Sequence, residues 1–319
     1  MNNATENTKV TGGTIESAAN TATNATAPES AKTPFWQSAS KRLLVQDIIV
    51  HAFLAVMAVI WLVPIVWVVA ESFNKNTAPF TRTFFPTEFS LDNYVKLFTD
   101  RTVMDFPRMF MNTFIIACFT CVISVLFVLM VAYVMSRMRF RLRRTFMSVV
   151  LILGMFPGIM AVSAIYFILK AVGLTGGGTT ILALILVYSA ASGAGFYVMK
   201  GYMDTIPNSL DEAAILDGCT RTQVFFKIIL PICKPMIVYQ AIVSFLGPWL
   251  DFVMAKVIAR TQGDYTVSLG LWLMLEKEYI NDWFARFAAG AVVVSIPIAI
   301  LFIVMQRFYQ DSMSGSVKG

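Results

Sequence analysis

The sequence is poor in charge, because only 14% of its 319 residues are charged while 57% are hydrophobic. A soluble domain is about half apolar and about a quarter charged. This balance excludes an ordinary soluble domain and indicates an integral membrane protein. The net charge is +6, and in a membrane protein such an excess matters through its position along the chain.

Histidine and cysteine are scarce as well. The single histidine, His51, has no second histidine or Cys/His cluster to complete a metal site, so we expect no bound metal. Cys118 and Cys121 form a C-x-x-C pattern inside an apolar run. Lipid disfavours the thiolate that redox chemistry needs, and we therefore interpret both as small packing residues.

The patterns of nucleotide binding and catalysis are missing too. The glycine run at 176–178 lacks the lysine of a phosphate-binding loop, so this chain is not expected to bind ATP in that way. There is no G-x-S-x-G pattern and no pair of intramembrane acids, which argues against a membrane enzyme. We expect a non-catalytic chain that binds no cofactor of its own.

Long apolar runs are what the sequence does have. A helix needs about 20 apolar residues to cross a bilayer core of roughly 30 Å. Six segments qualify, and they predict an all-α protein with six transmembrane helices: Ile48–Ala70, Thr113–Met135, Phe146–Leu169, Ile181–Val198, Met236–Met254 and Phe287–Met305.

The basic residues predict the orientation of these spans. The short loop SRMRFRLRR between the second and third spans carries five arginines and no acid, and loops of this kind stay in the cytoplasm. Both termini and the loop Lys200–Pro235 are then cytoplasmic, while Glu71–Asn112 and Ala255–Arg286 face outward.

Four regions follow from this map. Residues 1–40 are rich in Asn, Thr and Ala and predict a disordered cytoplasmic tail. Residues 41–111 hold the first span and an external segment, and residues 112–309 hold the other five spans. Residues 310–319 form a short cytoplasmic C-terminal tail.

A compact polar module interrupts the apolar pattern between the fourth and fifth spans. Ser209 to Glu212 and Thr220 to Gln223 each match the capping box that begins a helix. Gly218 is suited to end the first helix, and Pro231 to stop the second. The residues alone also allow a simple amphipathic loop that rests on the protein's own membrane helices.

The spacing of this module resembles the EAA loop of the permease subunits of ABC importers. The matching residues are Glu212, Ala213, Ala214, Asp217, Gly218, Phe225, Ile228, Leu230 and Pro231. The segment FFPTEFSLDNYVKLF and the ending GSVKG are similar to the MalG-like subunit of maltose-type sugar importers. Cys219 departs from the alanine that is usual there, and Asp311–Met313 departs from a common Gly-Leu-Thr.

The resemblance implies a type I ABC importer permease fold and a set of partners. These are a second homologous permease, two ATPase subunits that bind ATP and Mg²⁺, an extracytoplasmic sugar-binding protein and the lipid bilayer, with no nucleic acid. The EAA loop would couple to the ATPase. The tail residues Gly315, Val317, Lys318 and Gly319 would insert between the ATPase subunits.

The sequence constrains the identity of the substrate less than it constrains the fold and the partners. The resemblance implies a sugar of the maltose or maltodextrin type, with another oligosaccharide such as a galacto-oligosaccharide, or a polyol, as the alternative. Gly247 and Pro248 are expected to interrupt the fifth span and to expose Trp249 and Asp251, as a ring and an acid for holding a sugar. The alternative for Asp251 is a solvated span end. A secondary transporter would need inverted repeats, and we find none.

Overall fold

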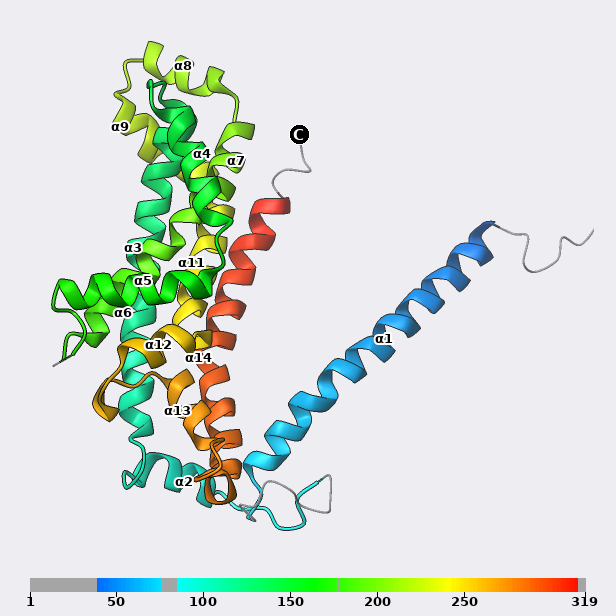
Figure 1. Ribbon diagram of the computed structural model, residues 1–319. Helices are drawn as coiled ribbons and strands as arrows, with labels where there is room; N and C mark the ends of the chain where they lie inside the picture. The colour runs from blue at the N-terminus through cyan, green and yellow to red at the C-terminus, as the bar shows by residue number, and fades with distance from the viewer. Residues whose placement is uncertain (1–38, 76–84, 177, 315–319) are drawn as a thin grey trace, which may run out of the picture. The chain divides into compact units, whose positions relative to one another are not determined.

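The computed structural model describes residues 39–75, 85–176 and 178–314, and in this part of the chain the regular structure is helical (Figure 1). One isolated bridge joins Asn74 to Phe89. The α-helices are α1 (Ala39–Ser72), α2 (Asp92–Thr99), α3 (Phe106–Arg137), α4 (Arg143–Gly154), α5 (Gly158–Ala171), α6 (Thr180–Ala191), α7 (Phe196–Thr205), α8 (Asn208–Leu216), α9 (Arg221–Val224), α10 (Leu230–Ile232), α11 (Lys234–Leu250), α12 (Val253–Ile258), α13 (Val267–Met274) and α14 (Ile280–Ser314). Two 3₁₀ segments, η2 (Ser192–Gly195) and η4 (Gln262–Asp264), and a π-helical turn, η3 (Phe225–Ile229), complete the elements.

The chain divides into two units, Met1–Trp61 and Leu62–Gly319. The first unit contains most of α1, a 34-residue helix with Pro64 inside it. The second unit contains every other helix and all the features discussed below. The predicted N-terminal tail lies almost entirely outside the described residues.

The spans agree with the expected all-helical membrane protein. Four helical stretches are long and apolar enough to cross a membrane: Leu43–Ser72, Phe106–Arg137, Thr180–Thr205 and Ile280–Arg307. Two bent helix pairs qualify if each pair forms one span, which brings the total to six among the described residues. The third of the four stretches passes through η2, a short 3₁₀ segment of small residues (Ser192–Gly195).

The third predicted span is not one straight helix. α4 and α5 meet at 105° around Met155–Pro157. Pro157 cannot donate a backbone hydrogen bond, and it takes an extended ψ of 125° immediately before α5. The prediction of one uninterrupted helix over Phe146–Leu169 was therefore wrong at its middle.

The fifth predicted span also has different limits. α11 follows α10 after a 77° bend and ends at Leu250, so Met236–Met254 was too long at its C-terminal end. Asp251 leaves the helical conformation with ψ of 120°, and α12 begins two residues later. Gly247 and Pro248 lie inside α11, so the expected interruption at these two residues was wrong.

The centre of the second unit is α3, which packs against α6, α7, α11 and α13. At its C-terminal end, Val128 and Ala132 are fully buried together with Met203 and Ile229. At its N-terminal end, an aromatic cluster surrounds Phe106. The four cysteines are free thiols, and Cys121 donates to the carbonyl of Ala241 at 3.5 Å on the α3–α11 interface. α3 is thus the element through which the two ends of the unit are joined.

Candidate functional site

The polar module between α7 and α11 folds as two short helical pieces joined at Gly218, and we call residues 208–232 the elbow. α8 ends in a left-handed turn, because Gly218 has φ of +86°. The amide of Cys219 returns to the carbonyl of Ala214 at 2.9 Å and closes the turn. A Cβ placed on Gly218 would meet no atom within 4 Å, so glycine is required there by the backbone angle and not by crowding.

The two predicted capping boxes have different outcomes. At the start of α9, Thr220 N donates to Gln223 Oε1 at 2.8 Å and Gln223 N donates to Thr220 Oγ1 at 3.3 Å, which confirms that box. The box at Ser209 was wrong, because α8 begins one residue earlier. Pro207 occupies the capping position with an extended backbone, which leaves Ser209 inside the first turn.

The helix after Thr220 continues past the predicted stop at Pro231. Phe225–Ile229 forms a π-helical turn in which Leu230 N donates to Phe225 O. Pro231 follows as the second residue of α10, and the chain remains helical to Ile232. The widened turn accommodates a proline that cannot donate to the preceding turn. The break comes instead at Cys233, before α11.

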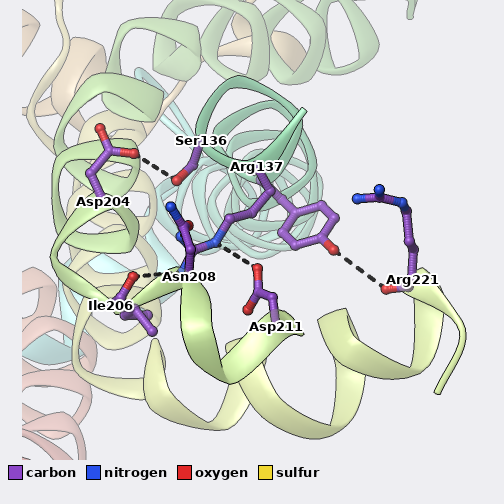
Figure 2. A network of polar contacts seen from close by, with 8 residues as sticks. Ser136, Arg137, Asp204, Ile206, Asn208, Asp211 and Arg221 are labelled. Carbon is purple, nitrogen blue, oxygen red and sulfur yellow. Dashed lines mark hydrogen bonds and ion pairs between the residues drawn. The ribbon is translucent and has the colours of Figure 1, made fainter. Parts of the chain in front are cut away.

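A buried ion pair fastens the elbow to the end of α3. Arg137 Nε lies 3.0 Å from Asp211 Oδ2, and the two side chains are only 5% and 15% exposed. The same guanidinium donates to Asn208 Oδ1 and, at 3.0 Å, to the carbonyl of Ile206. Figure 2 shows Arg137 reaching from α3 to the first turn of α8. The last residue of a membrane-spanning helix therefore holds the first helix of the elbow.

Further contacts tie the chain before the elbow, and the second helical piece of the elbow, to the same helix. Tyr133 donates from its hydroxyl to the carbonyl of Arg221 at 3.4 Å, and its ring lies 4.7 Å from that of Phe225. Ser136 donates to Asp204 Oδ1 at 2.6 Å, and Lys200 forms an ion pair with Asp204. α3 thus contacts the chain before α8 and also α9 and η3.

The nine residues of the EAA pattern separate into two faces. Ala214 is buried, and Phe225, Ile228 and Leu230 are half-buried against the core cluster at the end of α3. The rest of the pattern is exposed: Glu212, Ala213, Asp217, Gly218 and Pro231. Several exposed apolar side chains lie on the same elbow, among them Leu210, Ile215, Leu216 (88% exposed) and Phe226. The outer face is therefore small, partly apolar and free of cover within the described chain.

Sequence reasoning missed the residues that hold this site. Arg137 was counted only as one of the five arginines that set topology, and Asp211 only lay within the predicted capping box from Ser209 to Glu212. Nothing in the local pattern pairs residues so far apart in the chain. The available signal was the position of Arg137 at the end of a predicted span, next to a loop that contains acids.

The two residues predicted to bind sugar, Trp249 and Asp251, are not exposed together. Trp249 is 3% exposed and packs at 5.3 Å from Phe110 and 6.0 Å from Phe245 in the aromatic cluster. The expected exposure of Trp249 was therefore wrong, because α11 continues through Pro248 and turns this ring into the core. Its indole Nε1 has no hydrogen-bond partner among the described residues.

Asp251 occupies a junction between helices. Its Oδ2 accepts from the Tyr188 hydroxyl of α6 at 2.7 Å, and its Oδ1 accepts from the amides of Val253 and Met254 at 3.1 and 3.3 Å. Ser268 of α13 donates to its carbonyl at 2.6 Å. The carboxylate caps α12 and binds α6, so it is not simply a solvated span end.

Tyr188 also lines a cavity of about 290 Å³ between α3, α6 and α11. Gln240, 3% exposed, and Ser244 contribute polar atoms, and Gln240 Nε2 donates to Ser244 Oγ at 2.8 Å. Tyr239 lines the same cavity from a more exposed position. The cavity offers hydroxyl and amide groups of the kind that hydrogen-bond to polar solutes.

The other predicted features are quickly placed. The tail residues Gly315, Val317, Lys318 and Gly319 lie outside the described residues. Within the described ranges, no group of three His, Cys, Asp or Glu side chains is arranged to hold a metal ion.

Comparison with known families identifies the class to which this all-helical membrane unit and its elbow belong. Residues 124–314 match the family described as "Binding-protein-dependent transport system inner membrane component". The chain belongs to this family.

Relatives narrow the class. The chain is 35% identical to the galactooligosaccharides transport system permease protein GanQ of Bacillus subtilis (strain 168), over 84% of this chain and 94% of that protein. It is 28% identical to the maltodextrin permease MdxG of the same organism, over 88% and 100%. It is 30% identical to the trehalose permease SugB of Mycobacterium tuberculosis (strain CDC 1551 / Oshkosh), over 81% and 93%. The protein is thus a permease subunit of an ABC carbohydrate importer, and this subunit is a transport component without catalytic activity.

A solved structure shares the fold. A bacterial ABC transporter involved in import of the acidic polysaccharide alginate contains a chain that matches with a TM-score of 0.69 and 23% identity, over 85% of this chain and 98% of that one. The predicted ABC importer permease fold is therefore confirmed.

Proposed function

We propose that this chain forms half of the translocation pathway of an oligosaccharide importer. A second homologous permease completes the pathway, two ATPase subunits supply the energy, and an extracytoplasmic binding protein delivers the sugar. The family description names transport that depends on a binding protein. A solved alginate transporter is described in complex with a sugar-bound periplasmic protein, and the same arrangement is proposed here.

The elbow is the proposed coupling element. Its exposed face, which includes Glu212, Ala213, Asp217 and Gly218, docks on the ATPase and is displaced when the ATPase closes. The observation that carries this proposal is the buried Arg137–Asp211 pair. Separating a buried ion pair leaves an uncompensated charge, so the elbow moves together with α3 more readily than away from it. Because α3 packs on α6, α7 and α11, a displacement at the elbow reaches the helices around the 290 Å³ cavity.

The orientation is part of the proposal. The five arginines at 137–144, the elbow and both termini lie on the cytoplasmic side, where the ATPase is found. The C-terminal residues Gly315, Val317, Lys318 and Gly319 add a second contact with the ATPase. The two glycines among them are small enough to fit a narrow groove between its subunits.

The cargo is proposed to be a short oligosaccharide. The sequence pattern favoured a maltodextrin-type sugar, whereas the galactooligosaccharide relative is more similar to this chain than the maltodextrin relatives, at 35% against 28% and 29% identity. We therefore put galacto-oligosaccharides first and maltodextrins second. Asp251 is the candidate acceptor for sugar hydroxyls, because its Oδ2 accepts from Tyr188, which lines the cavity.

The test is uptake by the complete transporter in right-side-out vesicles that are loaded with ATP. Radiolabelled galacto-oligosaccharides and maltodextrins are offered with their binding protein, and a variant of the ATPase that cannot hydrolyse ATP is the control. ATP-dependent accumulation of either sugar supports the proposal, and the preferred one fixes the cargo. Uptake of neither sugar, or uptake that persists with the inactive ATPase, would overturn it.

A further inference from the structure

A second polar feature lies beside the elbow and is not used by the proposed coupling. A cavity of about 600 Å³ is formed by the α3–α4 connection, the first turns of α4 and one residue of α7. Five of its lining residues are basic: Arg139, Arg141, Arg143, Arg144 and Lys200. None of its lining residues is acidic.

Most of this positive charge is not neutralised by the chain. None of the four arginines takes part in an ion pair among the described residues, unlike the neighbouring Arg137. Lys200 is paired with Asp204. Several like charges around one hollow repel each other and raise the local concentration of anions. The cavity therefore favours an anionic occupant.

The surroundings of the cavity are apolar, which narrows the class of anion. Phe140, Met147 and Leu151 line it beside the arginines. None of the residues of α4 is buried, and Leu151, Ile152 and Leu153 are each more than half exposed. The pocket lies at the end of a membrane-spanning helix, where a bilayer changes from headgroups to acyl chains. A free phosphate ion would use the arginines and leave this apolar surface in water.

We propose that this basic pocket binds the phosphate headgroup of an anionic phospholipid, with an acyl chain lying along the exposed face of α4. Basic pockets beside membrane helices recognise anionic headgroups in this manner. The basic pocket lies next to the elbow, which is the proposed coupling element. Arg139 and Arg143 also line the adjoining cavity of about 940 Å³ that contains Arg137, Asp211 and Glu212. A bound headgroup would lower the positive potential next to the Arg137–Asp211 pair.

The test uses the complete detergent-solubilised transporter, titrated with phosphatidylglycerol and, separately, with zwitterionic phosphatidylcholine, and bound lipid is counted by native mass spectrometry. The variant is Arg141→Gln with Arg144→Gln, because these two arginines line the basic pocket and not the cavity at the elbow. The matched control is Arg101→Gln with Lys170→Gln, two exposed basic residues outside the pocket.

We expect preferential retention of phosphatidylglycerol by the wild type and the control pair. The Arg141/Arg144 variant should bind it roughly 30-fold more weakly, which is about fivefold for each basic residue removed near an anionic surface. Equal binding by variant and wild type would overturn the proposal. So would displacement of the lipid by millimolar inorganic phosphate, which would identify a free-anion site. A loss of the ATPase subunits instead of the lipid would identify the pocket as a protein interface.

Discussion

The guanidinium of Arg137 lies 3.0 Å from the carboxylate of Asp211, with both side chains largely withdrawn from solvent. One residue ends the central membrane helix and the other lies in the first turn of the elbow. The contact gives a rigid link between a surface that a partner can reach and the helices that surround the cavity.

Breaking this ion pair should uncouple ATP hydrolysis from sugar uptake. Arg137→Ala leaves Asp211 buried without its cation and should cost about 3–5 kcal/mol locally. We expect little sugar uptake, with ATP hydrolysis that no longer responds to the loaded binding protein. Uptake and ATPase rates of the purified complex in proteoliposomes measure both effects. The paired exchange Arg137→Asp with Asp211→Arg is the control and should recover part of the response. Full coupling in Arg137→Ala would show that α8 needs no fastening to α3.

The backbone of the elbow gives a second prediction. Gly218→Val forces a branched residue to φ of +86°, at a cost of roughly 1–2 kcal/mol, and should abolish transport while the protein still reaches the membrane. Gly218→Asn should be milder, since asparagine tolerates this region. Gly201→Val is the matched control, because Gly201 is also unobstructed but lies within α7. Normal uptake by Gly218→Val would mean that the turn has no role in coupling.

Substitutions at Asp251 can separate the effect of its negative charge from its role in capping α12. Asp251→Asn keeps a side chain that can cap α12 but removes the negative charge. We expect a normal membrane level and a raised KM for sugar uptake. Asp251→Ala should also lose about 1 kcal/mol of stability with the cap. Tyr239→Phe, at the cavity that Tyr188 also lines, is the control for the loss of a hydroxyl. An unchanged KM in Asp251→Asn would leave Asp251 with a capping role only.

The C-terminal tail can be tested by truncation. Deletion of Gly315–Gly319 should lower transport or reduce the amount of ATPase that copurifies, because a contact with the ATPase subunits is lost. Membrane insertion should not change. The readouts are copurification from membranes and uptake. If the truncated complex keeps its ATPase and transports at the wild-type rate, these residues make no functional contact.

Topology is tested by labelling single cysteines in a background without native cysteines. Arg139→Cys should be protected from an impermeant reagent applied to intact cells, because the basic loop is cytoplasmic. Gly176→Cys should react. The opposite pattern would reverse the whole map and place the elbow on the wrong side for an ATPase.

Local chemistry predicted part of the elbow well. Gly218 and the Thr220–Gln223 box were predictable because each depends on residues a few positions apart. The start of α8 was missed because Pro207 sets the backbone before Ser209 can act as a cap. Here one local preference overrode another.

Elsewhere the sequence-based prediction was limited by the averaging of hydropathy over a window and by tertiary contacts that local sequence does not reveal. Phe146–Leu169 is apolar throughout, so a window average does not register the bend that Pro157 causes. The burial of Trp249 depends on Phe110 and Phe245, which no pattern near Pro248 reveals. The Arg137–Asp211 pair is likewise a product of the assembled fold. Spans are therefore visible in the sequence, whereas the contacts that join them are not.

The π-helical turn at Phe225–Ile229 has a chemical consequence. Pro231 brings no amide hydrogen to the helix, so one carbonyl oxygen in this stretch lacks its intrahelical donor. Phe226 and Lys227, which belong to this turn, are both exposed. The elbow therefore lacks one backbone donor at Pro231, and the turn before it exposes an aromatic ring and an ammonium group. Only a change at position 231 itself, such as Pro231→Ala, would restore that donor.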